Sequence, residues 1–87
     1  MLKPLTISYF AWLRDRTGFA QEEFALPEGI ETVGELISYL IAKDAGHAAA
    51  FRNRKIVRCA VNQEFASDAS RIRPGDEVAF FPPVTGG

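Results

Sequence analysis

The last residues of the sequence, AFFPPVTGG, are those whose types and order could take part in chemistry. Pro82 and Pro83 have a fixed φ and favour extended polyproline geometry, so they would hold the chain straight. Gly86 and Gly87 have no Cβ, so they could enter a channel too narrow for side chains, and the terminal carbonyl carbon would be unshielded. This order predicts an arm that presents a C-terminal carboxylate to another protein's active site: Pro82, Pro83, Val84, Thr85, Gly86 and Gly87.

A carboxylate is a poor electrophile until one of its oxygens becomes part of a leaving group. Adenylation of Gly87 by ATP would achieve this, with AMP as the leaving group. The chain lacks a Gly-rich Lys-Ser/Thr loop for phosphates, so a partner would supply the nucleotide site. The activated acyl group could then react with sulfur, giving a thiocarboxylate, or with a lysine amine, giving an isopeptide bond. A sulfur carrier and a protein modifier are therefore both open, beside a plain binding module.

The rest of the chain offers little catalytic chemistry. His47 is the single histidine and is expected in a solvated loop just past a helix. Cys59 falls on the apolar face of a strand and is expected to be a core residue. No cluster has metal-ligand spacing, and no carboxylate pair is marked for acid–base work. The domain is thus expected to be non-catalytic by itself, with neither a metal nor a cofactor.

Composition narrows the functional class. The chain has 87 residues and a net charge of −1, which predicts one small domain and argues against nucleic-acid binding. No apolar run is long enough to span a bilayer, no signal peptide is evident, and the single cysteine fits a reducing compartment, so a cytoplasmic protein is expected. One local basic cluster stands out; it is interpreted as a solvated edge or, less favoured, as a docking site for an acidic partner: Arg52, Arg54, Lys55 and Arg58.

One helix is strongly predicted within TVGELISYLIAKDAG. Five apolar residues follow the i, i+3, i+4 spacing of a single helical stripe. Thr32 and Glu35 have the spacing of a capping box, and Gly46 is expected to end the helix. The stripe consists of Val33, Leu36, Ile37, Leu40 and Ile41.

Several strands surround this helix. Alternation predicts a first strand around residues 5–9, followed by a short helix that ends at Gly18. A second strand precedes a Pro-Glu-Gly turn, and KIVRCAVNQEFA predicts a hairpin that turns near Asn62-Gln63. The last strand, residues 77–81, is apolar on both faces, which is typical of a central strand. The pattern predicts an α+β domain with a mixed sheet.

The stretch PGDEVAFFPPVTGG resembles the C-terminal signature of the small subunit of molybdopterin synthase, a family of ubiquitin-like sulfur carriers. Similarity extends to ISYFAWLRDRTG, TVGELISYL and CAVNQEFA, and so covers nearly the whole chain. Two departures are Thr85, where alanine is common, and Gln63, where glycine often follows the asparagine.

The resemblance implies a β-grasp (ubiquitin-like) fold in residues 1–81, with one main helix across the sheet, a short helix after the first strand, and a tail of residues 82–87. It also implies that a ubiquitin-activating-like enzyme adenylates Gly87 and a sulfurtransferase supplies the sulfur. The thiocarboxylate then donates sulfur to cyclic pyranopterin monophosphate in the large subunit, within a heterotetramer. Phe81 is expected either in the core or at the partner interface. A protein modifier, or a carrier for thiamine or tRNA thiolation, is the alternative.

Overall fold

A computed structural model describes residues 3–83 of the chain. Its centre is a five-stranded sheet with the order β2-β1-β5-β3-β4. The strands are β1 (Leu5–Tyr9), β2 (Gln21–Phe24), β3 (Arg58–Val61), β4 (Glu64–Ala66) and β5 (Glu77–Phe81). β1 and β5 are parallel, whereas the other neighbouring pairs are antiparallel. The sheet is therefore mixed and β5 is its middle strand, as the sequence predicted.

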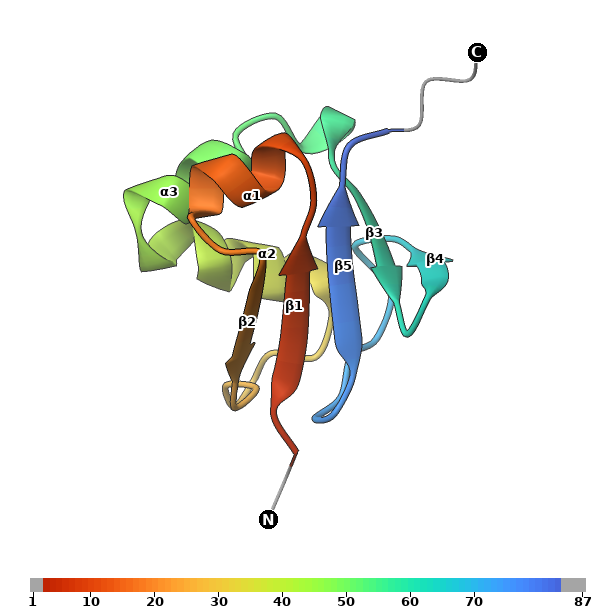
Figure 1. The fold of residues 1–87 in the computed structure, drawn as a ribbon. Helices are drawn as coiled ribbons and strands as arrows, with labels where there is room; N and C mark the ends of the chain where they lie inside the picture. Colours follow the sequence, from red (N-terminus) through yellow and green to blue (C-terminus); the bar gives the residue numbers. More distant parts are fainter. Residues whose placement is uncertain (1–2, 84–87) are drawn as a thin grey trace.

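Helix α2 (Val33–Lys43) lies across one face of this sheet, behind the strands in Figure 1. Its capping box is formed as predicted, because Thr32 Oγ1 accepts a hydrogen bond from Glu35 N–H and Glu35 Oε1 accepts one from Thr32 N–H. Four of the five stripe residues are buried, but Ile41 is 40% exposed and lies outside the core. The covered face of the sheet contributes the other half of the core, including Leu5, Ile7, Cys59, Val78 and Phe80.

Two shorter helices close one end of the covered face. α1 (Trp12–Thr17) follows β1 and ends at Gly18, whose φ of 85° lies in the left-handed region, as expected for a helix C-cap. Its Leu13 is fully buried, whereas Trp12 is only partly buried. α3 (Ala45–Ala50) packs against both α1 and α2, and the 3-10 turn η1 (Arg54–Ile56) leads into β3. Within residues 3–83, no helix has the length and apolarity needed to cross a membrane.

The predicted helix end at Gly46 is wrong. α2 ends at Lys43, because Asp44 adopts an extended conformation and its carboxylate accepts the backbone N–H of His47, which starts α3. Gly46 lies inside α3, and a Cβ at this position would come within 2.6 Å of the carbonyl oxygen of Arg16. Glycine is thus required here for the close approach of α3 to α1, and not for a helix stop.

The predicted hairpin is confirmed. β3 and β4 pair antiparallel, and the two residues between them, Asn62 and Gln63, have φ values of 51° and 70°. Positive φ at both central positions is the property of a type I′ turn, whose twist matches that of the flanking strands.

Candidate functional site

The chain leaves the sheet at Phe81, the last residue of the central strand. Phe81, Pro82 and Pro83 are all partly exposed, so the start of the predicted arm is accessible. The remaining predicted tail residues, Val84, Thr85, Gly86 and Gly87, lie outside the described residues. Their role in presenting a carboxylate therefore stays a prediction.

Phe81 belongs to the face of the sheet that α2 does not cover. Side chains alternate along β5, so Val78 and Phe80 are buried while Ala79 and Phe81 point to the other face. The register places Ala60 opposite Ala79 and Phe65 opposite Ala60, so all of these residues share that face. We call Ala60, Phe65, Ala79 and Phe81 the open-face patch.

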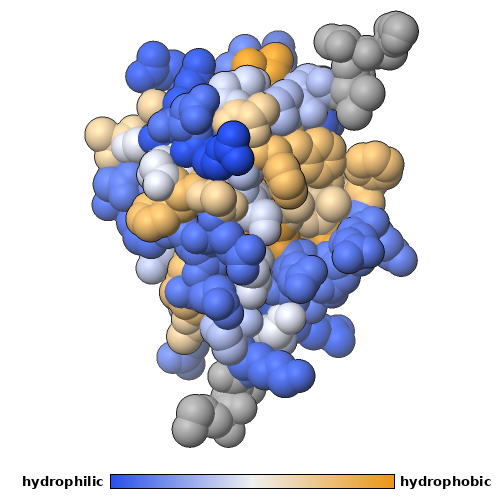
Figure 2. All heavy atoms as spheres, viewed as in Figure 1, coloured by the Kyte–Doolittle hydropathy of each residue, from blue (hydrophilic) through white to orange (hydrophobic). Residues whose placement is uncertain are grey.

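The open-face patch exposes aromatic surface beside the tail. Phe65 is 85% exposed, and the centroid of its ring lies 6.1 Å from that of Phe81. Figure 2 shows apolar surface gathered over this side of the molecule, next to the end of β5. An exposed aromatic pair flanked by small alanines is typical of a protein-binding surface. Phe81 was predicted either in the core or at the partner interface. Its side chain is only partly buried and lies on the face that α2 does not cover, which favours the interface.

The basic cluster lies at the same end of the sheet. Arg58 is the register partner of Phe81, and its Nη1 donates to the carbonyl oxygen of Lys55 at 2.8 Å. Arg54 differs from the others, since it forms an ion pair with Asp68 and donates to the carbonyl oxygen of Val57. Arg52, Lys55 and Arg58 are exposed.

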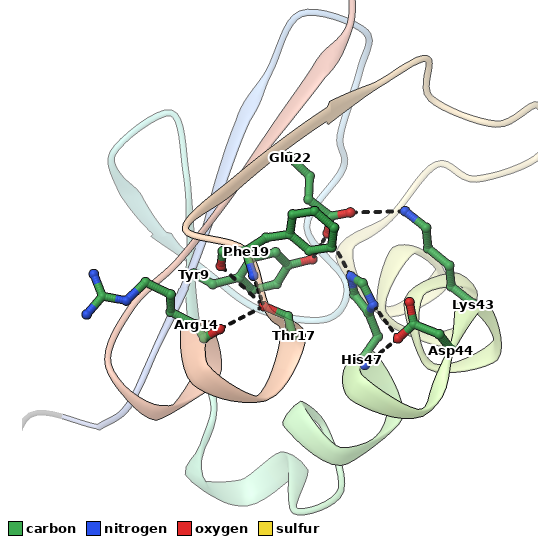
Figure 3. Close-up of polar contacts among 8 residues, drawn as sticks. All are labelled: Tyr9, Arg14, Thr17, Phe19, Glu22, Lys43, Asp44 and His47. Atoms are coloured by element: carbon green, nitrogen blue, oxygen red, sulfur yellow. Dashed lines mark hydrogen bonds and ion pairs between the residues drawn. The ribbon is translucent and has the colours of Figure 1, made fainter.

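The expectation of a solvated His47 is wrong. Its side chain is fully buried in α3 and lies between two carboxylates (Figure 3). Its Nε2 is 2.7 Å from Glu22 Oε2, and its Nδ1 is 2.7 Å from Asp44 Oδ1. Each ring nitrogen thus lies within hydrogen-bonding distance of one carboxylate, and the imidazole bridges Glu22 on β2 to Asp44 at the start of α3.

Glu22 collects further donors from the covered face. The Tyr9 hydroxyl donates to Oε2 at 2.7 Å, and Lys43 Nζ donates to Oε1 at 3.0 Å. Burial alone would raise the pKa of Glu22, but the hydrogen bonds from His47, Tyr9 and Lys43 outweigh it and lower this pKa. The backbone N–H and the ring of His47 likewise lower the pKa of Asp44. Tyr9, Glu22 and His47 are buried, while Lys43 and Asp44 lie exposed at their edge; we call these five residues the buried polar network.

The buried polar network connects β1 and β2 to α2 and α3 on the covered face, so its role is structural. Burial, followed by the hydrogen bond with Glu22, raises the pKa of the Tyr9 hydroxyl, which therefore remains a donor. Among residues 3–83, no group of three or more His, Cys, Asp or Glu side chains has the arrangement needed to hold a metal ion.

Cys59 is buried, as predicted for a core residue. Burial raises the pKa of its thiol, and the Sγ contacts the carbonyl oxygen of Ala66 at 3.4 Å. A buried thiol with a raised pKa is a poor nucleophile, so Cys59 is unsuited to carry sulfur itself.

Sequence reasoning missed Phe65 as a candidate interface residue. The residues next to Phe65, Glu64 and Ala66, show no clear alternation of polar and apolar side chains, so the strand alone did not indicate which face Phe65 occupies. The signal was the hairpin: once residues 62 and 63 form the turn, Phe65 falls opposite Ala60 and joins the face of Phe81.

A mixed sheet with a helix across one face, and a chain that leaves from the end of the central strand, defines a β-grasp protein. Comparison with known proteins agrees. A model of the ThiS family matches residues 7–87, and the chain belongs to this family.

Individual relatives cover almost the whole chain. The molybdopterin synthase sulfur carrier subunit of Escherichia coli (strain K12) is 37% identical over 83 residues, which are 95% of this chain and 99% of that protein. A structure from Pyrococcus furiosus, provisionally designated molybdopterin converting factor subunit 1, is 31% identical with a TM-score of 0.76, covering 94% of this chain and 99% of its own. Small archaeal modifier protein 1 of Haloferax volcanii is 25% identical with a TM-score of 0.72, at the same coverage.

Proposed function

We propose that this protein is the sulfur carrier of molybdopterin synthesis, with the carboxyl group of Gly87 as the site that carries the sulfur. The observation that carries the proposal is the match to a sulfur carrier subunit along 95% of the chain, on a fold whose central strand leads into the Gly-Gly tail. Cys59, the single cysteine of the chain, is buried and so does not compete with Gly87 as a carrier of sulfur.

The chemistry needs two other proteins. An adenylating enzyme joins the Gly87 carboxylate to AMP from ATP, with release of pyrophosphate. A sulfurtransferase then delivers sulfur to the acyl carbon, AMP leaves, and a thiocarboxylate remains. The chain binds no cofactor of its own in this scheme, and the reactions take place in the cytoplasm.

The thiocarboxylate donates its sulfur in the large subunit of molybdopterin synthase. There the tail inserts and its sulfur attacks the cyclic pyranopterin monophosphate. Water then cleaves the bond between this sulfur and the acyl carbon of Gly87, which restores the carboxylate, and two such transfers complete the dithiolene. The open-face patch supports this docking, because Phe65 and Phe81 offer exposed aromatic surface directly beside the start of the tail.

A protein modifier is the second candidate. The likeness to small archaeal modifier protein 1, with a TM-score of 0.72, supports it. Both functions begin with the same adenylate and differ in what attacks it, so the product distinguishes them.

The decisive test is the intact mass of the chain after incubation with ATP, a sulfide source and its cognate adenylating enzyme. A sulfur carrier gains the mass difference between sulfur and oxygen at Gly87, and loses it again when the large subunit and the pterin precursor are added. Isopeptide-linked products without that mass gain would instead establish the modifier.

The tail itself is tested by Gly86→Leu, with Gly86→Ala as the small matched control. A leucine side chain blocks a channel that admits only a bare backbone, so molybdopterin formation should fall about 100-fold or more. Thermal unfolding should be unchanged, because the hydrophobic core is formed by residues that precede the tail. Full synthesis by Gly86→Leu would refute the narrow channel.

A further inference from the structure

Charge is unevenly distributed along the chain. Residues 45–63 contain no aspartate or glutamate, yet they hold four of the ten lysines and arginines. The eleven acidic residues all lie outside this segment, so the remainder of the chain is clearly acidic. Such segregation creates a local positive potential on a protein whose net charge is only −1.

The fold brings this segment to the exit of the tail. Arg58 pairs in register with Phe81, the residue from which the tail departs. The bond from Arg58 to the carbonyl oxygen of Lys55 holds the arginine against η1, and Figure 1 places this turn beside the chain that follows β5. Arg52 precedes the same turn and is exposed.

Three of these cations form no ion pair within residues 3–83. Among residues 3–83, Arg52, Lys55 and Arg58 form no ion pair, whereas Arg54 is held by Asp68. We call Arg52, Lys55 and Arg58 the basic rim. Their charges are therefore not neutralised by an ion pair within the described residues, although Arg58 also donates to the carbonyl oxygen of Lys55.

The tail is too short to keep a partner away from the basic rim. Six residues follow Phe81, and an extended chain reaches at most about 3.5 Å per residue, or about 20 Å in all. Any enzyme that takes Gly87 into its interior must therefore approach the end of the sheet closely. Its surface around the channel mouth then faces the basic rim.

We propose that the basic rim docks on a carboxylate-rich surface beside the channel mouth of the large subunit of molybdopterin synthase. The inference rests on the proposed function, because that function supplies the partner. The open-face patch gives the contact its apolar centre, and the rim supplies long-range attraction and orientation at its edge.

The test measures binding of the full chain to its cognate large subunit at low and high salt. The rim variant is Arg52→Gln, Lys55→Gln and Arg58→Gln together. The matched control is Lys3→Gln, Arg71→Gln and Arg73→Gln, which removes the same charge near the turn at Gly75, before β5 begins. All six side chains are exposed, so both variants should unfold at nearly the wild-type temperature.

At about 50 mM salt we expect the rim variant to bind about 10-fold more weakly than the control, mainly through a slower association rate. At about 1 M salt the difference should vanish, because charges are screened within about 3 Å. Equal binding by both variants at low salt would refute the basic rim. A rim variant that docks normally but is adenylated slowly would refute the choice of partner. Failure of the wild-type chain to bind would instead refute the proposed function.

Discussion

Among single residues, His47 is buried between two carboxylates. Its buried ring joins Glu22 to Asp44, so replacement removes one hydrogen-bond partner of the buried Glu22 carboxylate, which keeps those from Tyr9 and Lys43. Removing one hydrogen-bond partner of a buried group costs about 1–3 kcal/mol, and more when that group is charged. We expect His47→Leu to lower the free energy of unfolding by about 3 kcal/mol, measured by urea denaturation at neutral pH.

A double-mutant cycle separates this electrostatic effect from lost packing. In the Glu22→Gln background, His47→Leu leaves no carboxylate at position 22 without a partner. The loss of stability in the double variant should therefore be smaller than the sum of the two single losses by about 1 kcal/mol or more. Simple additivity would show that the contact between the imidazole and the Glu22 carboxylate contributes nothing specific.

The same network predicts how stability depends on pH. The folded state lowers the pKa of Glu22 below its ordinary value of 4.5, so the unfolded state binds the proton more readily. The stabilisation is fully present above that value and is lost as the pH falls through the folded-state pKa. We expect Glu22→Gln to be less stable than wild type at neutral pH, with the gap closing as the pH is lowered.

Urea unfolding at intervals from neutral pH to about pH 2 measures this gap. Asp44, whose pKa is also lowered, remains in both proteins, so each retains some acid sensitivity. A gap that stays constant over the whole range would contradict the assignment of a lowered pKa to Glu22.

Among the elements, the β3–β4 hairpin carries avoidable backbone strain. Gln63 has a φ of 70°, a region in which a side chain costs about 1–2 kcal/mol and glycine costs little. Gln63→Gly should therefore stabilise the domain by about 0.5–1 kcal/mol, after the entropy that glycine gains in the unfolded chain is subtracted. Gln63→Val should destabilise it, and urea denaturation of both variants gives the comparison. Equal or lower stability of the glycine variant would contradict a strained turn.

The sequence predicted the elements whose determinants are local. The stripe and capping box of α2, the turn at Asn62-Gln63 and the central place of β5 all depend on neighbouring residues or on a strand's own composition. The end of α2 could not be predicted in this way. Gly46 resembles a helix stop, but its role depends on the approach of Arg16 from a distant helix.

The residues of the candidate site also differ in whether their determinants are local in the sequence. Pro82 and Phe81 were identified from their order in the chain, and the structure places them at the accessible end of the sheet. His47 was misplaced because its partner Glu22 is 25 residues away, on a strand with no visible relation to it. Long-range polar pairing leaves no periodic pattern in a sequence.

Across the whole molecule, the two faces of the sheet have different roles. The helices and the buried polar network stabilise one face, and the other face is left without a covering element in the described chain (Figure 1). Such a division lets the exposed surface change without loss of the fold, because exposed side chains contribute little to stability.

This division predicts that docking and stability can be separated by mutation. Phe65→Ser removes an aromatic ring that is 85% exposed, so the free energy of unfolding should change by no more than about 0.5 kcal/mol. Under the proposed docking, binding to the large subunit should weaken about 10-fold or more, because aromatic residues that become buried at the centre of an interface carry much of its energy. Ile41→Ser is the matched control, since Ile41 is an exposed apolar residue on α2, across the sheet from the patch. Calorimetric titration of both variants gives the comparison, and an equal loss of affinity in the two would mean that the open face has no special part in docking.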